Sequence, residues 1–484
     1  IVEDDGSFWT GTRDNGVVHH HNDYDVEYHP DGPLNNYSYR LRTFGNKLYM
    51  LPGGRWASQY TRPVELMILE NDQWTNMTNK NLVQKAGHAL YDAMDVAQDP
   101  YDPNHYFITT YGTGMIEMQD TNVVKLYLAS NSEFHSAAPS NPDLYTRIDR
   151  IMYDDQNNLW VLNAGGNQGN VHVISPDGRW TSFDLSSISL DTPGDLIMDI
   201  RNPQWKWISI VRAGTGLILL QDNGTPHNPN DDKVTFRNTW IDQNSRNIAP
   251  ENIYSIAQDN DNTLWVGTNS GVFTIPSHID FATSNQCERI VIPRNDGSGL
   301  GDYLLDGEQI NCIAIDGANR KWIGTASSGV FLIQITTNEM GGKDIETVAH
   351  FTTENSLMPS DNVLSIAINE LSGEVFIGTA AGLVSYMSDA IEPEENFNNL
   401  YAYPNPVHPT YRGHITIKGL MVDTQVRLLP AAGHLLKTME RQGGAAVWDG
   451  NNARGQRVAS GVYTAVCNTK SGENHNSVKI LIMN

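Results

Sequence analysis

A short pattern of apolar and polar positions recurs along the chain. In residues 252–275, an apolar run ends at Asp259 and its Asx neighbours, and is followed by 264–268 (LWVGT) and 271–275 (GVFTI). β-Branched and aromatic residues suit a half-buried pleated surface, whereas Asp, Asn and Gly favour the turns between strands. The pattern therefore predicts a strand, an Asx-rich turn, a tryptophan strand, a glycine turn and a further strand.

The same unit returns along most of the chain, and its aromatic anchors lie 40 to 58 residues apart by subtraction of their numbers. The anchors are Trp9, Tyr49, Phe107, Trp160, Trp207, Trp265, Trp322 and Phe376. Such a repeat, with several short strands in each period, is typical of a β-propeller, whose small sheets bury their faces by stacking on one another. We expect an all-β chain in which a seven-bladed propeller runs from Tyr49 to Phe376. Trp9 then belongs to a remnant of a preceding propeller, and one eight-bladed ring is the alternative.

The composition changes at 388–399 (SDAIEPEENFNN), which is acidic, rich in Asn and without an apolar period, as in a linker. Beyond it, short alternating strands and turns predict a small Ig-like β-sandwich. The predicted organisation is a blade remnant over 1–20, the propeller over 21–390, the linker over 391–400 and the Ig-like C-terminal domain over 401–484.

The sequence of 484 residues contains 41 glycines and no apolar run of about eighteen residues, so no transmembrane segment is expected. Because the sequence opens inside a repeat, we expect a fragment whose true N-terminus is missing. The lack of a visible signal peptide is then uninformative.

The formal net charge of −24 argues against a partner that is a nucleic acid. The charge is uneven along the chain. Residues 400–484 hold nine Lys and Arg against four Asp and Glu, a net charge of +5, which leaves −29 for residues 1–399.

Acidic residues gather at three places along the propeller repeats: Asp92, Asp95, Asp99 and Asp102; Asp154 and Asp155; and Asp259 and Asp261. Several carboxylates in one loop suit calcium. The repeat, however, places these acids at equivalent turns, where Asp closes a hairpin by accepting hydrogen bonds from nearby backbone, and we favour that interpretation. No nucleophile elbow, phosphate-binding glycine loop or CxxC pair is present. We therefore expect no catalytic residue, no metal site and no cofactor.

The Trp-x-Gly-Thr strands, together with the loop of Leu357, Met358, Pro359 and Ser360 before an apolar strand, resemble the two-component regulator propeller repeat. The resemblance covers roughly residues 1–390.

The end of the chain resembles the C-terminal signal domain of the type IX secretion system of certain Gram-negative bacteria. The motifs are YAYPNPV at 401–407, the turn at 430–433, SGVY at 460–463 and a basic-apolar end. The matching positions are Pro404, Asn405, Pro406, Gly433, Gly455, Ser460, Gly461, Val462, Tyr463 and Lys479. The chain departs from this family at 430–433, where Pro-Ala-Ala-Gly replaces the usual Asx-x-x-Gly turn.

The combination of regulator-type repeats with this C-terminal domain resembles a component of the cell-surface attachment complex of type IX secretion. The resemblance implies a non-catalytic scaffold, exported to the cell surface and peripheral to the outer membrane. It also implies the partners PorU (the sortase), PorV and PorQ, and anionic lipopolysaccharide that is attached to cargo. The basic tail offers Lys418, Arg427, Lys437, Arg454 and Arg457 as possible contacts to the glycolipid. The alternatives are a secreted adhesin or other cargo of the same system, and a periplasmic polysaccharide sensor.

Overall fold

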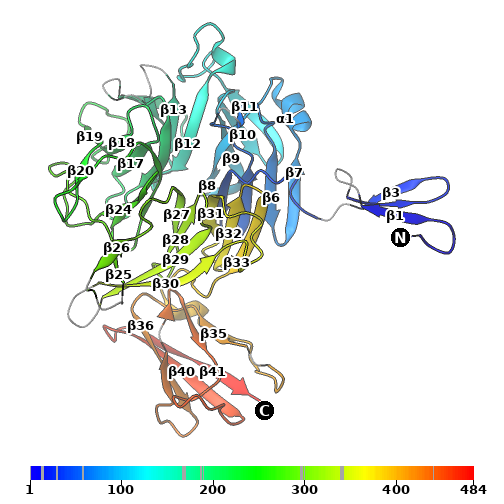
Figure 1. Ribbon diagram of the computed structural model, residues 1–484, viewed down its shortest axis with the longest axis vertical. Helices are drawn as coiled ribbons and strands as arrows, with labels where there is room; N and C mark the ends of the chain where they lie inside the picture. The colour runs from blue at the N-terminus through cyan, green and yellow to red at the C-terminus, as the bar shows by residue number, and fades with distance from the viewer. Residues whose placement is uncertain are drawn as a thin grey trace.

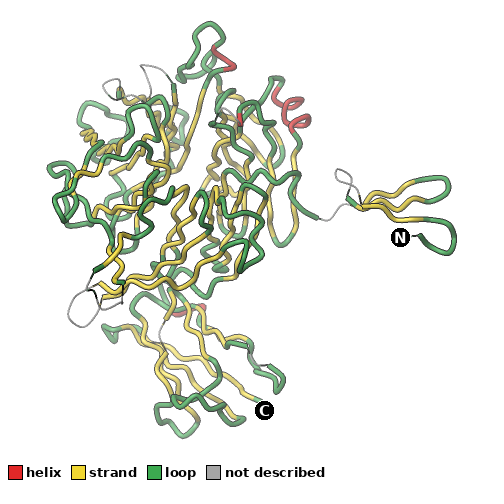
Figure 2. Tube along the Cα trace, viewed as in Figure 1, coloured by secondary structure: helices red, strands yellow, loops and turns green. Residues whose placement is uncertain are grey.

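The chain folds into a ring of small sheets, a sandwich at the C-terminal end and a short sheet at the N-terminal end (Figure 1). The computed structural model describes residues 2–11, 16–28, 31–56, 59–165, 170–185, 188, 190–294, 298, 300–337, 343–411, 413–439 and 441–483. Strands and the loops between them make up almost all of this structure (Figure 2). The predicted all-β class is confirmed.

Within the described residues, seven antiparallel sheets form the ring. The first three are β4 (Arg40–Phe44), β5 (Lys47–Leu51), β6 (Leu66–Glu70) and β7 (Gln73–Met77); β8 (Ala93–Asp99), β9 (Asp102–Thr110), β10 (Met115–Gln119) and β11 (Asn122–Tyr127); and β12 (Arg147–Tyr153), β13 (Leu159–Ala164), β14 (Asn170–Ile174) and β15 (Trp180–Asp184). The fourth and fifth are β16 (Pro193–Met198), β17 (Trp205–Ile210), β18 (Gly216–Gln221) and β19 (Lys233–Arg237); and β22 (Ile253–Gln258), β23 (Leu264–Thr268) and β24 (Gly271–Ile275). The last two are β27 (Ile310–Ile315), β28 (Lys321–Thr325), β29 (Val330–Thr337) and β30 (Lys343–Phe351); and β31 (Val363–Ile368), β32 (Glu374–Thr379) and β33 (Gly382–Met387).

Shorter elements connect the blades. Between β7 and β8 lies α1 (Asn79–Ala86), which starts at the cap Thr78 and ends at Gly87 in the left-handed conformation. The hairpins β20 (Trp240–Ile241) with β21 (Asn247–Ile248), and β25 (Val291–Pro293) with β26 (Gly301–Tyr303), flank the fifth blade.

The ring closes between its first and last blades, where β31 lies beside β4. The Ser38 hydroxyl donates to the Thr379 carbonyl at 2.8 Å, and the Thr43 hydroxyl donates to the Ile368 carbonyl at 2.7 Å. Seven apolar clusters fill the seven interfaces between adjacent blades, and one of them joins Leu41 and Met50 to Phe376. The ring is therefore complete with seven blades, and the alternative with eight blades is not what forms.

The seven aromatic anchors from Tyr49 to Phe376 lie on the second strand of each blade and are buried. Four of the tryptophans share a further bond, because the indole Nε1 donates to an aspartate in the turn that precedes the strand. These pairs are Trp160 with Asp154 (2.8 Å), Trp207 with Asp199 (2.9 Å), Trp265 with Asp259 (2.9 Å) and Trp322 with Asp316 (3.0 Å). The aspartate also accepts backbone N–H groups of its own turn, so one carboxylate fixes both the turn and the core side chain.

The C-terminal domain is a sandwich of two four-stranded sheets around Trp448 and Tyr463. One sheet contains β34 (Tyr401–Tyr403), β35 (Ile415–Lys418), β39 (Ala445–Trp448) and β38 (Arg441–Gln442), and the other contains β37 (Lys437–Met439), β36 (Thr424–Pro430), β40 (Gly461–Thr469) and β41 (His475–Ile482).

The sandwich docks on the ring through glycines. The Gly444 N–H donates to the Ile391 carbonyl at 2.6 Å. A Cβ on Gly443 would lie 2.0 Å from that carbonyl oxygen and 2.6 Å from the backbone of Gly317. Gly443 and Gly317 carry no side chain, which allows the two domains to approach this closely.

A third sheet, of β1 (Phe8–Gly11), β2 (Val17–His20) and β3 (Asp25–Tyr28), stands apart from the ring (Figure 1). It carries Trp9 on its first strand and extends past residue 20, the predicted end of the remnant. No helix among the described residues reaches the length and hydropathy that a bilayer-spanning segment needs.

We predict that Asp154→Ala lowers the free energy of unfolding by about 2–4 kcal/mol, because it leaves the buried N–H groups of Trp160 and Asn158 without an acceptor. Asp155→Ala, at the exposed neighbouring position, is the control and should change it by less than about 0.5 kcal/mol. Urea denaturation followed by tryptophan fluorescence measures both. Equal effects of the two variants would contradict the role given to the turn aspartate.

We also predict that Gly443→Ala loosens the docking of the C-terminal domain, because the new Cβ overlaps the Ile391 carbonyl. Gly472→Ala is a matched control, since both glycines have positive φ, of 62° and 75°, but a Cβ on Gly472 meets open space. Limited proteolysis of the segment 388–400 should be several-fold faster in the first variant and unchanged in the second. Identical cleavage rates would show that the glycine contact does not hold the domains together.

Candidate functional site

The predicted signal residues gather at the end of the sandwich that points away from the propeller (Figure 1). Asn405 connects the N-terminal motif to the last strand: its Nδ2 donates to the Lys479 carbonyl at 2.8 Å, and its Oδ1 accepts the Leu481 N–H at 3.0 Å. The Val407 N–H donates to the Leu481 carbonyl at 2.8 Å. The segment containing Pro404 and Pro406 thus covers the outer edge of β41 over its last residues.

The second motif lies across the same end. Gly461 pairs with Ile482, and Tyr463 pairs with Ile480 on one side and with Pro430 on the other. The Tyr463 hydroxyl donates to the Ala459 carbonyl at 2.9 Å, and its ring lies 5.5 Å from that of Trp448.

The remaining signal positions belong to this end as well. Ser460 and Val462 flank Gly461, while Gly433 and Gly455 take positive φ in turns that lead to and from these strands. Strand pairing thus brings signal positions that are far apart in the sequence, such as Asn405, Gly461 and Lys479, to the same end of the sandwich.

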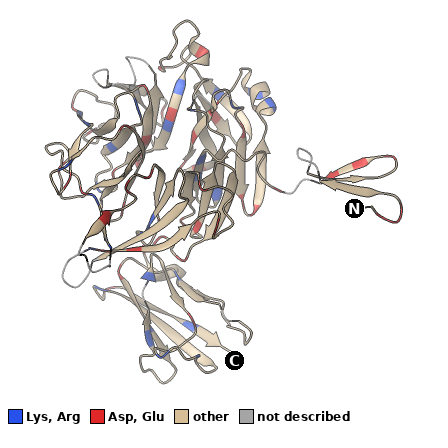
Figure 3. Ribbon diagram, viewed as in Figure 1, with Lys and Arg blue, Asp and Glu red and all other residues tan. Residues whose placement is uncertain are grey.

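Positions of Lys and Arg are scattered over the ribbon of the sandwich (Figure 3), and the five predicted glycolipid contacts lie on both sheets and in the loop before β40. Lys418 lies on the outer face of one sheet, with its Nζ 5.5 Å from the centre of the Tyr403 ring, whereas Arg427 is exposed on the opposite sheet. Lys437 pairs with Asp449 at 3.3 Å. Arg457 donates to the Asp449 carbonyl at 3.2 Å, and Arg454 is exposed in the loop before it.

A groove between the second sheet and β38 at the edge of the first sheet brings Arg427 together with two cations that the sequence analysis did not single out, Arg441 and Lys470. His475 and Asp423 also line it, and Lys470 lies 3.6 Å from Asp423. Lys470 follows β40, which pairs with β36, whereas Arg441 lies on β38 of the first sheet, which contacts β36 at the edge of the sandwich. Neither neighbour of Arg427 can therefore be read from the sequence.

The propeller axis holds a second candidate site, which the sequence analysis missed. Arg40 and Arg42 on β4, Asp95 on β8, Asp149 and Arg150 on β12 and Asp195 on β16 meet there with Arg55, from the loop after β5. Inner strands surround the axis, so their inward side chains converge although they come from different blades. The sequence analysis grouped Asp95 with the turn residues Asp92, Asp99 and Asp102. The structure separates Asp95 from that group, because its carboxylate pairs with arginines at the axis.

Ion pairs connect these charges. Arg42 donates two hydrogen bonds of 2.9 Å to the Asp95 carboxylate. Arg40 pairs with Asp95 and with Asp195, each at 3.3 Å. Arg150 donates to Asp195 at 3.2 Å, and Arg55 pairs with Asp149. Burial opposes the charge of Asp95, but Arg42 and Arg40 outweigh it and hold the pKa of that carboxyl well below its usual range.

The acids outside the axis close turns. Asp99 accepts the Tyr101 N–H at 2.9 Å, and Asp102 accepts the Asn104 N–H at 3.0 Å. Asp92 differs from them, because it accepts the N–H groups of Thr61 and Arg62 from a loop that lies far from it in the sequence. Among the described residues, no group of three or more His, Cys, Asp or Glu is placed to hold a metal ion.

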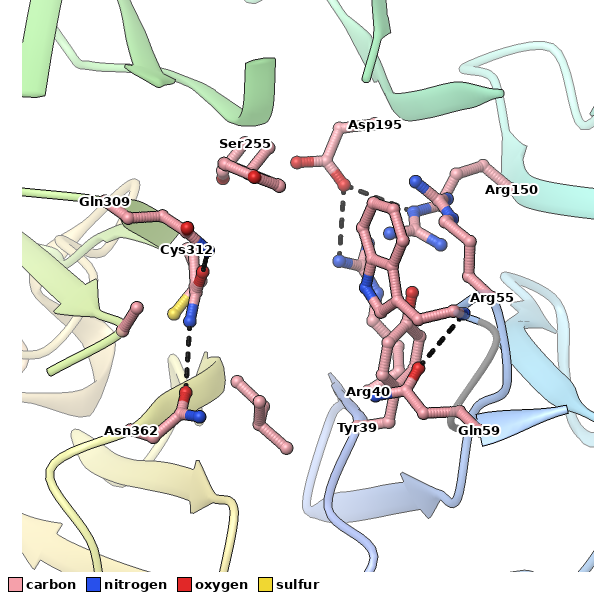
Figure 4. Close-up of a pocket in the computed structure, with 15 residues that line it drawn as sticks. Tyr39, Arg40, Arg55, Gln59, Arg150, Asp195, Ser255, Gln309, Cys312 and Asn362 are labelled. Atoms are coloured by element: carbon pink, nitrogen blue, oxygen red, sulfur yellow. Dashed lines mark hydrogen bonds and ion pairs between the residues drawn. The ribbon is translucent and has the colours of Figure 1, made fainter. Parts of the chain in front are cut away.

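A pocket of about 320 Å3 opens on one side of the axial charges (Figure 4). Arg40, Arg55, Arg150 and Asp195 form one wall, and Cys312 lies across from them. The rest of the wall is neutral or aromatic: Tyr39, Trp56, Gln59, Tyr254, Ser255, Gln309, Asn311, Ala326, Asn362 and Leu364. Burial raises the pKa of the Cys312 thiol to about 12, so this cysteine stays a neutral thiol.

Comparisons with known proteins agree with this architecture. Residues 247–270 match the family model described as two component regulator propeller. Among curated proteins, none matches the chain in sequence. The extracellular domain of the putative hybrid two-component system BT3049 from B. thetaiotaomicron is 12% identical to the chain, with a TM-score of 0.47. The alignment covers 99% of this chain and 67% of that domain.

One solved structure is more similar. PorZ of Porphyromonas gingivalis, described as an essential bacterial surface component of the type IX secretion system, has 26% identity and a TM-score of 0.69. The alignment covers 97% of this chain and 63% of PorZ, so the chain spans less than two thirds of that protein's length. The chain is thus similar to PorZ in fold over nearly all of its own length, as its propeller repeats and C-terminal motifs predicted.

Proposed function

We propose that the chain is a non-catalytic, cell-surface component of the type IX secretion attachment complex. In this role it scaffolds the sortase PorU beside PorV and PorQ at the outer membrane, and it binds the anionic lipopolysaccharide that is attached to cargo. The similarity to PorZ over 97% of the chain is the observation that carries the proposal. The clustering of the signal residues at one free end of the sandwich supports it, because that end is available for docking.

Charge supports the glycolipid part of the proposal. A net charge of −29 over residues 1–399 repels a polyanion, whereas the sandwich carries +5. On the sandwich, the groove of Arg427, Arg441 and Lys470 gathers cations on one face, and the Lys470 side chain is 79% exposed. We therefore place the glycolipid contact in this groove rather than across all five predicted residues.

A cargo protein of the same system is the second candidate, because the same C-terminal signal would direct it to the surface. Scaffold and cargo differ in what becomes of the sandwich. A scaffold that uses the groove retains residues 401–484, whereas a cargo protein attached to glycolipid loses its signal.

We predict that the chain binds purified anionic lipopolysaccharide, and that the affinity falls as ionic strength rises, because the contact is largely between charges. The double variant Arg427→Glu, Lys470→Glu should weaken binding by at least about tenfold, which corresponds to about 1.4 kcal/mol. Lys418→Glu makes a single charge reversal on the opposite sheet and should change the affinity much less. Titration at low and high salt, followed by light scattering or surface plasmon resonance, measures all three.

The glycolipid part of the proposal would be wrong if the double variant bound as tightly as the unchanged chain. A larger loss in Lys418→Glu would move the contact to the other sheet. Full binding by a chain that lacks residues 400–484 would move it to the propeller.

A further inference from the structure

The charges on the propeller axis are unbalanced. Four arginines (Arg40, Arg42, Arg55 and Arg150) face three aspartates (Asp95, Asp149 and Asp195), and all seven are largely buried. A buried charge without a counter-charge is costly. Burial, and after it the neighbouring Arg150, lower the pKa of Arg40, which agrees with an excess of positive charge. The axis therefore favours one additional negative charge.

Three of the four arginines face the axial pocket, whereas Arg42 lines a cavity on the other side of the axial charges, together with Arg40 and Glu370. Arg40, Arg55 and Arg150 all line the pocket, and Asp195 is the acid among its lining residues. Arg55 is 3% exposed, and its Nε is a buried donor without a hydrogen-bond partner. An unsatisfied buried N–H beside a cavity is the feature that a bound acceptor would complete.

The pocket rim is built by a repeated irregularity of the inner strands. β22, β27 and β31 each carry a β-bulge at the same position, at Tyr254, Asn311 and Leu364, and all three residues line the pocket. The first strands of three further blades, β8, β12 and β16, also shift register near this position, so the irregularity belongs to the repeat. Such a bulge re-aims a side chain. Three blades thus direct one additional residue each toward the same cavity.

The rim offers aromatic faces and side-chain amides. The ring centres of Trp56 and Tyr254 lie 6.4 Å apart, and the guanidinium of Arg212 lies over the Trp56 ring, 4.8 Å from its centre. Gln59, Gln309 and Asn362 supply amides, which both donate and accept hydrogen bonds. An aromatic face with nearby amides suits a flat ring that carries hydroxyl groups. A volume of about 320 Å3 limits the ligand to roughly one such ring.

We propose that the axial pocket binds a monosaccharide-sized ligand with one acidic group, a carboxylate or a phosphate, which Arg40 and Arg55 receive while the sugar ring lies against Trp56. The site is distinct from the groove on the sandwich, and the proposal does not depend on the function proposed above.

Isothermal titration of the whole chain with D-glucuronate, glucose 6-phosphate, glucose and inorganic phosphate tests the proposal. We expect at least one of the two acidic sugars to bind saturably, and at least about tenfold more tightly than both glucose and inorganic phosphate. Glucuronate and glucose 6-phosphate differ in the acid, so their order shows whether the arginines receive a carboxylate or a phosphate.

Trp56→Ala should weaken the binding of the acidic sugar by at least about tenfold, because it removes the stacking face without touching an ion pair of the axis. Trp74→Ala is the matched control, since Trp74 lies on the outer strand β7 and does not line the pocket, and it should leave the affinity unchanged. Circular dichroism confirms that both variants fold.

Three results would overturn the proposal. The first is the absence of saturable binding by either acidic sugar, and the second is equal binding by glucose or by inorganic phosphate. The third is an unchanged affinity in Trp56→Ala.

Discussion

Closure of the ring is the constraint on which the rest of the structure depends. Each blade is a small sheet with two apolar faces, and it buries both of them only when it has a neighbour on either side. The contacts of Ser38 and Thr43 with the last blade join residues more than three hundred positions apart, and they give the first and last blades their missing partners. Each of the seven interfaces around the axis then holds its own apolar cluster.

The same closure creates the axial site. Inner strands from different blades are forced to face each other, so their inward side chains meet where water is scarce. Charged residues at these positions must pair, and Arg40 does so with aspartates from two other blades, Asp95 and Asp195. These ion pairs join four arginines to three aspartates. The pocket beside them is therefore lined by more positive than negative charge, which favours an acidic ligand.

The repeat predicted the architecture because the tryptophan strand and its turn are local features. Trp265 and Asp259 lie six positions apart, and their bond repeats in other blades, so the sequence alone indicated both the strand and the turn. The axis and the groove could not be predicted in this way. Arg40 and Asp195 have no relation in the sequence, and Arg427 and Lys470 become neighbours only through strand pairing. The bulges that aim Tyr254 and Asn311 also have no sequence signature of their own.

The central claim is that the chain works as a retained surface scaffold of type IX secretion. The most direct measurement is purification of the tagged full-length chain from the outer-membrane fraction of the bacterium that produces it, with intact-mass analysis and identification of the proteins bound to it. The account predicts a mature protein that still contains residues 401–484 and that co-purifies with PorU, PorV and PorQ. A protein that lacks this domain, carries glycolipid at its new C-terminus and has none of these partners would contradict the account and establish it as cargo.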